Sequence, residues 1–162
     1  MSEDIFRPAR ELSADITDKY PNRFFPVRLF ESTLQKYFED EARHGTVFIP
    51  SRHDGSLYFN ASAFARGLKI IFDGCEKGAA KTITATMVEH NFTLYIKVDG
   101  KLASRQDMAV AARIMHMAGF KLSCDESTVQ LIGKLAEMNI YSLYNTDINE
   151  LQSAMMYEFY DT

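Results

Sequence analysis

The residues whose side chains most often carry chemistry are scattered along this chain. The four histidines are His44, His53, His90 and His116. No cysteine, aspartate or glutamate stands at the spacing from them that a metal site uses, so we predict no metal site. His53 precedes Asp54, a pair that suits a phosphate-accepting histidine, but the pair falls in a turn-like run, residues 51–55. We therefore interpret the histidines as structural and predict no catalytic residue.

The two cysteines, Cys75 and Cys124, lie among apolar residues without the spacing of a metal motif. Cys75 falls on the apolar side of a predicted helix, residues 61–77, where burial makes a thiol inert. This pattern is typical of reduced core cysteines in an intracellular protein, and a single disulfide is the alternative.

The composition is that of a globular protein. Its 162 residues include 18 Lys and Arg against 22 Asp and Glu, a net charge of −4, and 46% are hydrophobic. The apolar runs are shorter than the ~18–20 residues that a membrane span needs. The first ten residues lack the apolar run of a signal peptide. We expect a cytoplasmic protein that binds no membrane, and the acidic excess argues against nucleic-acid binding.

Apolar residues at helical spacing predict the elements that would position a site. One stripe runs through residues 27–43, with Glu31 on its solvent side, and ends at Gly45. A second stripe, residues 61–77, follows Asn60, which can cap a helix, and is interpreted as a central core helix.

A third helix is predicted to begin at Ser104 or Asp107 and to end near Ala118, before Gly119. Its apolar stripe is wide and includes Met117, so most of its circumference should be buried.

Strands are predicted from alternating apolar residues and from turn residues between them. They are residues 46–49, 56–59, 82–88, 92–98, 120–124 and 128–132, of which the middle two form an antiparallel hairpin. The fold class is therefore α+β, a two-layer α/β sandwich with a mixed sheet of about five strands and the helices on one face.

From Pro26 to about Leu135 these residues resemble the ATPase domain shared by sensor histidine kinases, gyrase-type proteins and related chaperones, the GHKL superfamily. The stretch 67–77 looks like the end of that family's central helix, where the family has Asn-Ala-x-Lys. Asp99-Gly100 lies near the place of its nucleotide-sensing aspartate. The resemblance implies a histidine kinase ATPase-like fold for residues 26–135, between an N-terminal arm or short helix, residues 1–25, and a C-terminal extension, residues 136–162.

The resemblance also implies that the residues of a vestigial nucleotide pocket gather near one end of the central helix. These are Asp73, Gly74, Lys77, Asp99, Gly100 and Lys101. We expect Lys77 and Lys101 to neutralise the carboxylates of Asp73 and Asp99 in the absence of phosphate and metal.

The departures from the family's pattern concern every part of the nucleotide site. Gly74 has no side chain to hold a metal ion where the family has asparagine, and Lys69 stands where an acidic partner is usual. The glycines that follow Asp99 in the family are misplaced here, and glycine is what lets backbone approach a ligand closely. About five residues separate Asp99 from the next helix, too few for a phosphate-binding lid. The fold looks retained and the nucleotide site erased.

The C-terminal extension carries more aromatic surface than one helical face can bury. Ile148 and the residues that follow predict a terminal helix that packs on the same domain. Aromatic side chains dominate the energy of many protein interfaces. We predict that a protein partner or a second copy binds Tyr141, Tyr144, Met155, Tyr157, Phe159 and Tyr160.

Three functions follow as alternatives. The first is a non-catalytic regulatory module of bacterial two-component signalling, a pseudo-ATPase that needs no cofactor and acts by binding protein. The second is an active GHKL protein that binds ATP and Mg²⁺, either a histidine kinase fragment or an anti-sigma-type serine kinase. The third is an unrelated α+β enzyme whose site the sequence does not reveal.

Overall fold

The computed structural model of this chain describes residues 22–41 and 45–136. Most of the predicted N-terminal arm lies outside these ranges. The predicted terminal helix and the six predicted partner-binding residues also lie outside the described residues.

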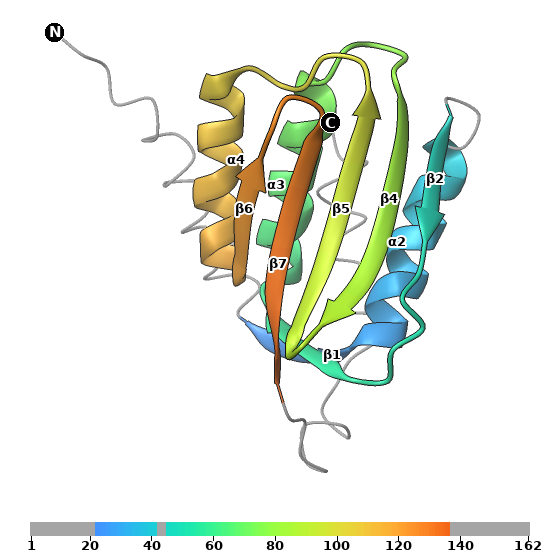
Figure 1. Ribbon diagram of the computed structural model, residues 1–162. Coiled ribbons are helices and arrows are strands. Elements are labelled where there is room, and N and C mark those ends of the chain that lie inside the picture. Colours follow the sequence, from blue (N-terminus) through green and yellow to red (C-terminus); the bar gives the residue numbers. More distant parts are fainter. Residues whose placement is uncertain (1–21, 42–44, 137–162) are drawn as a thin grey trace, which may run out of the picture.

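The described chain contains strands and helices in the order that Figure 1 shows. They are β1 (Arg23–Pro26), α2 (Val27–Glu41), β2 (Thr46–Ile49), β3 (Ser56–Phe59), α3 (Ala61–Gly74), β4 (Ala80–Val88), β5 (Asn91–Asp99), α4 (Arg105–Ala118), β6 (Phe120–Cys124) and β7 (Thr128–Ala136). All three helices lie on one side of the sheet (Figure 1).

The sheet of the described residues has seven strands in the order β1-β3-β7-β5-β4-β2, and β6 also pairs with β7. The pair β2–β4 is parallel and the others are antiparallel, so the sheet is mixed as predicted. The sequence pattern did not predict β1, because Phe24 and Phe25 stand between two prolines. Four residue pairs with β3, from Arg23↔Phe59 to Pro26↔Ser56, hold this short strand in place.

Two cap residues explain where the central helix starts and stops. The Asn60 side-chain oxygen accepts a hydrogen bond from the Ala63 amide at 2.9 Å, as expected for an N-cap. The helix ends at Gly74, earlier than the predicted Lys77, because Cys75 adopts an extended conformation with φ −72° and ψ 160°.

The third helix resolves the predicted choice of cap residue. The Ser104 hydroxyl accepts from the Asp107 amide at 3.1 Å, so the helix begins at Arg105. Gly119 ends it in the left-handed conformation, φ 100°, which favours glycine. Met117 was predicted to be part of the buried stripe, but it is 37% exposed because it lies on the side of α4 away from the sheet.

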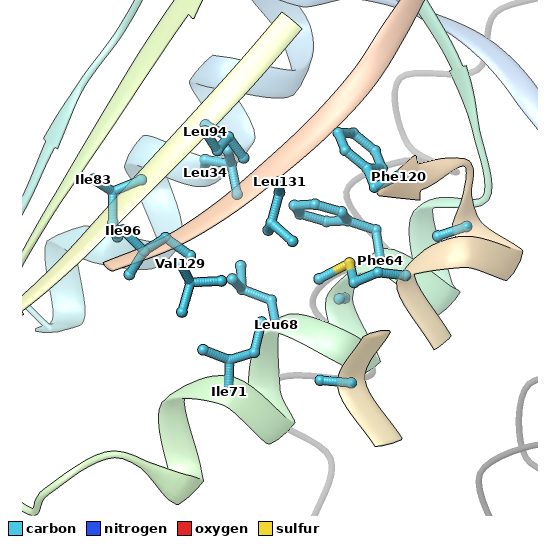
Figure 2. Packing of buried hydrophobic residues seen from close by; sticks show 14 of the residues in the cluster. Leu34, Phe64, Leu68, Ile71, Ile83, Leu94, Ile96, Phe120, Val129 and Leu131 are labelled. Carbon is cyan, nitrogen blue, oxygen red and sulfur yellow. The ribbon is translucent and has the colours of Figure 1, made fainter. Parts of the chain in front are cut away.

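Phenylalanines from every layer form the centre of the core. The Phe30 ring on α2 lies 5.0 Å from that of Phe59, 5.1 Å from Phe64 and 5.6 Å from Phe92, all edge-to-face. Figure 2 shows Phe64 of α3 beside Phe120 of β6, and their ring centroids are 4.8 Å apart. Full burial of such a side chain contributes about 1.5–3 kcal/mol to the free energy of unfolding.

The helices α3 and α4 approach closely where Gly67 faces Met115. A Cβ atom at Gly67 would lie 3.0 Å from the Met115 methyl carbon, so glycine leaves room for the methionine. This contact sets α3 beside α4 and brings their neighbouring loops together. None of the described helices is long and apolar enough to cross a membrane.

Candidate functional site

The turn after α3 lies against the segment that joins β5 to α4. The Glu76 amide donates a hydrogen bond to the Lys101 carbonyl at 2.8 Å, and the Ala79 amide donates to the Glu76 carbonyl at 3.1 Å. Asp99, the last residue of β5, pairs with Ala80, the first of β4. The structure therefore brings Asp99, Gly100 and Lys101 to the turn that follows α3. Whether these residues derive from a nucleotide pocket stays a prediction.

Gly74 is the position where the contact between the two segments is tightest. A Cβ atom placed there would lie 2.5 Å from the Ala103 Cβ and 3.2 Å from the Ala103 Cα. The Asp107 carboxylate would be 3.2 Å away. Because two of these atoms belong to Ala103 and its backbone, a side chain at this position would force the segment before α4 to move.

Gly100 makes a second close approach on the other side of the turn. A Cβ atom there would lie 2.6 Å from a Glu76 carboxylate oxygen and 3.0 Å from the Ala79 Cβ. Residues 100–104, which join β5 to α4, therefore pack on the end of α3 at Gly74 and on the turn that follows it at Gly100.

The charges at the end of α3 are arranged differently from the prediction. The Asp73 carboxylate pairs with Lys69, one turn earlier, at 3.4 Å. The prediction was that Lys77 and Lys101 would neutralise the carboxylates of Asp73 and Asp99. The pairing follows from helix geometry, because residues four apart lie on the same face. Asp73 is exposed, so this ion pair contributes at most about 1 kcal/mol.

A buried cation beneath this region was missed by the sequence reasoning. Lys81 is only 9% exposed, and its ammonium donates to the Ala79 carbonyl at 3.1 Å and lies 5.5 Å from the centre of the Phe72 ring. The signal was present in the sequence, because Lys81 shares the inward alternation of β4 with Ile83.

The two cysteines have different environments, and both thiols are free. Cys75 is buried as predicted, and its thiol donates to the Ile71 carbonyl at 3.1 Å. Burial raises the pKa of the Cys75 thiol, although a hydrogen bond with the Ala103 backbone and the charge of Lys81 act in the opposite direction. The prediction for Cys124 was wrong: it is exposed, because it is the last residue of β6, a strand that pairs on one side only among the described residues.

Two polar side chains, Glu31 on α2 and His53 in the loop between β2 and β3, make hydrogen bonds to that loop. Glu31 was predicted to face solvent but is only 4% exposed, and its carboxylate accepts from the Ser51 hydroxyl at 2.7 Å and from the Ser51 amide. His53 accepts a hydrogen bond at Nδ1 from the Gly55 amide at 2.8 Å. Both side chains therefore hold the loop between β2 and β3.

Side chains that commonly bind metal ions do not cluster in the part of the chain that the structure describes. Within residues 22–41 and 45–136, no three His, Cys, Asp or Glu side chains lie close enough together to hold an ion.

Comparison with known proteins places this geometry in context. The sequence matches no protein-family profile, and no curated protein matches it significantly. In contrast, many solved structures are similar to it. The Acinetobacter baumannii histidine kinase AdeS aligns with a TM-score of 0.56 and 14% identity, over 81% of this chain and 77% of that one.

Two further solved structures agree with this likeness. A histidine kinase from Burkholderia phymatum aligns with a TM-score of 0.51 and 14% identity, over 80% of this chain and 77% of that one. The cytoplasmic segment of histidine kinase QseC aligns with a TM-score of 0.50 and 12% identity, over 85% of this chain and 98% of that one. The chain therefore has the histidine kinase ATPase-like fold, as its resemblance to the GHKL superfamily predicted.

Proposed function

We propose that this protein is a non-catalytic signalling module on a histidine kinase ATPase-like fold, which regulates by binding another protein and does not hydrolyse ATP. The observation that carries the proposal is the contact between Gly74 and Ala103. The resemblance puts the metal-holding asparagine of the family at this end of the central helix, where this chain has no room for a side chain.

The connection between β5 and α4 supports the same proposal. Only residues 100–104 join the two elements, and they are held on the end of α3 by the hydrogen bond from the Glu76 amide to Lys101. A phosphate-binding lid needs backbone amides that face an open space. Here the segment that would supply the lid packs on protein instead. Asp73, which has an oxygen that suits Mg²⁺, faces Lys69.

The proposed partner-binding residues are in the C-terminal extension, outside the described residues. The last 26 residues contain five Asp and Glu and no Lys or Arg, together with all five aromatic side chains assigned to the interface. Aromatic anchors with an acidic rim are a composition that suits a protein interface. We propose that Tyr141, Tyr144, Met155, Tyr157, Phe159 and Tyr160 bind a partner of a cytoplasmic bacterial two-component system, or a second copy.

Thermal unfolding in the presence of Mg-ATP tests the first half of the proposal. A ligand at 100 times its Kd stabilises a protein by about 2.7 kcal/mol, which for a chain of this size raises Tm by roughly 5–10 °C. We expect no change in Tm up to millimolar Mg-ATP. A nucleotide-binding histidine kinase domain, measured in the same plate, is the positive control. A saturable rise in Tm for this chain would favour the alternative of an active ATP-binding protein.

Deletion of residues 146–162 tests the second half. We expect the shortened chain to stay folded by circular dichroism and to lose its partner or its dimer mass in light scattering. If both chains are folded monomers with the same partner binding, these residues do not form the interface.

A further inference from the structure

The strand β6 has one open side in the described structure, and its register with β7 fixes which of its backbone groups face that side. β6 pairs with β7 and with no other described strand (Figure 1). At the turn between them the Asp125 amide donates to the Thr128 carbonyl at 3.0 Å. Because hydrogen-bonded pairs alternate along an antiparallel ladder, Ser123 bonds to β7 in the same way, whereas the backbone groups of Leu122 and Cys124 face the open side.

Bonds on the other side of β7 support this alternation. The Val98 amide donates to the Ser127 carbonyl, and the Leu135 amide donates to the His90 carbonyl, both at 2.9 Å. In each bond an odd-numbered residue in β7 or directly before it, Leu135 or Ser127, is joined to a residue in β5 or directly before it. The even-numbered residues of β7 therefore face β6, in agreement with the turn.

A groove of about 900 Å³ runs beside this open side of β6. Leu102, Met108 and Leu122 supply its apolar walls, from the segment before α4, from α4 itself and from β6. Two exposed cations, Lys101 and Arg105, line the same groove.

Two carboxylates also line the groove, those of Asp125 and Glu126, and one of them is engaged within its own turn. Asp125 accepts from the amides of Ser127 at 3.0 Å and Thr128 at 2.8 Å within the turn. These bonds do not remove the charge of Asp125, and Glu126 is exposed. The two carboxylates therefore offset Lys101 and Arg105, and the groove itself favours apolar side chains.

We propose that β6 and this groove bind an acidic, partly apolar segment of a partner protein, which adds to the sheet as one more strand. An exposed sheet edge recognises extended peptides through backbone hydrogen bonds, and side-chain pockets beside it supply the specificity. The proposal uses described residues alone and is independent of the role proposed for residues 140–160.

The alternation of side chains along the added strand defines the ligand. Side chains that point to the helix side lie over Met108 and Leu122, so they are apolar. Side chains that point to the other side of the sheet lie near Lys121, which is exposed on β6. A strand in which acidic residues alternate with Val or Ile meets both conditions.

Amide exchange measured by NMR on the full-length chain tests this proposal. The probe is the blocked peptide Glu-Val-Asp-Val-Glu-Ile-Asp. We expect saturating peptide to slow exchange at Leu122 and Cys124 at least tenfold and to leave Lys121 and Ser123 unchanged, since their amides already bond to β7. The same peptide N-methylated at alternate residues keeps its charge but cannot pair as a strand, and should produce no slowing.

A charge variant separates the strand edge from general electrostatic attraction. Lys121→Ala should weaken peptide binding about two- to fivefold, the effect of one exposed ion pair. The matched control Lys97→Ala removes an exposed cation from β5, and should leave binding unchanged.

Four results would overturn the proposal. The first is slow exchange at Leu122 and Cys124 in the free protein at every concentration, which would mean that another part of the chain covers β6. The second is protection that rises with protein concentration alone, which would identify a second copy as the occupant. The third is equal binding of the N-methylated peptide, and the fourth is equal effects of the Lys97 and Lys121 variants.

Discussion

Gly74 and Ala103 meet so closely that a Cβ atom at Gly74 would lie 2.5 Å from the Ala103 Cβ. The two residues are far apart in the sequence, at the end of α3 and just before α4. Their contact closes the end of the central helix, where the resemblance to the GHKL superfamily places a metal ligand. The lack of a side chain at Gly74 is therefore a packing requirement of this chain.

Replacing Gly74 with asparagine should destabilise the protein and should not create nucleotide binding. The new side chain would push the backbone at Ala103, and overpacking of this kind costs about 1–3 kcal/mol. The measurement is the urea midpoint of unfolding with an unchanged m-value, followed by a Mg-ATP titration. Gly78→Asn is the control for space, because no atom lies within 4 Å of a Cβ atom there. Its cost is limited to the backbone strain of its positive φ, 80°, a conformation that asparagine adopts more readily than most residues. A Gly74→Asn protein that is as stable as wild type, or that binds Mg-ATP, would contradict the packing argument.

Removing the N-cap of the central helix should also lower stability. Asn60 is completely buried and accepts from the Ala63 amide, so Asn60→Ala should cost about 0.5–2 kcal/mol. Asn60→Ser keeps a side-chain oxygen and should recover part of the loss. The free energies of unfolding from urea titrations decide this; equal losses for alanine and serine would show that the cap is not the cause.

The buried carboxylate of Glu31 should stabilise the loop between β2 and β3. Glu31→Ala leaves the Ser51 amide and hydroxyl without their acceptor, which should cost about 1–3 kcal/mol. Glu31→Gln keeps an acceptor oxygen at the same place and should be milder. The comparison is made by chemical denaturation, with Glu126→Ala as an exposed control. A loss no larger than that of the control would mean that the bonds to Ser51 contribute nothing.

The two cysteines should differ in reactivity and in their effect on alkaline stability. Ellman's reagent should modify the exposed Cys124 rapidly and reach Cys75 only after unfolding. Because burial raises the pKa of the Cys75 thiol above its ordinary value of 9.0, the unfolded chain loses this proton first as the pH rises. Stability that Cys75 contributes is therefore complete below pH 9 and is lost as the pH rises further.

The pH effect is measured as the difference in free energy of unfolding between wild type and Cys75→Ala from pH 7 to 10.5. We expect this difference to be constant up to about pH 9 and to shift against wild type above it. A difference that does not depend on pH, or rapid labelling of both thiols in the native protein, would contradict the assignment.

Several elements could be predicted because their signals are local. The spacing of apolar residues along α3 and α4 depends only on the 3.6-residue period, and the caps at Asn60 and Gly119 act within one turn. The hairpin of β4 and β5 follows from alternation and a short connection. The resemblance to the histidine kinase ATPase domain was itself a match of these local patterns in order, which is why it predicted the fold at identities of only 12–14% to the three solved structures described above.

The sequence by itself determined the helices, most of the strands and the class of the fold, because hydrophobic period and capping act over a few residues. Only the tertiary structure decided which residues meet. The strand β1 depends on pairing with β3, and Glu31 is buried because Ser51 folds over it. Cys124 is exposed because no strand of the described residues pairs with the outer side of β6, and Gly74 is closed off because Ala103 packs on it. Each of these outcomes rests on a contact between residues distant in the chain, and such contacts leave no periodic trace in the sequence.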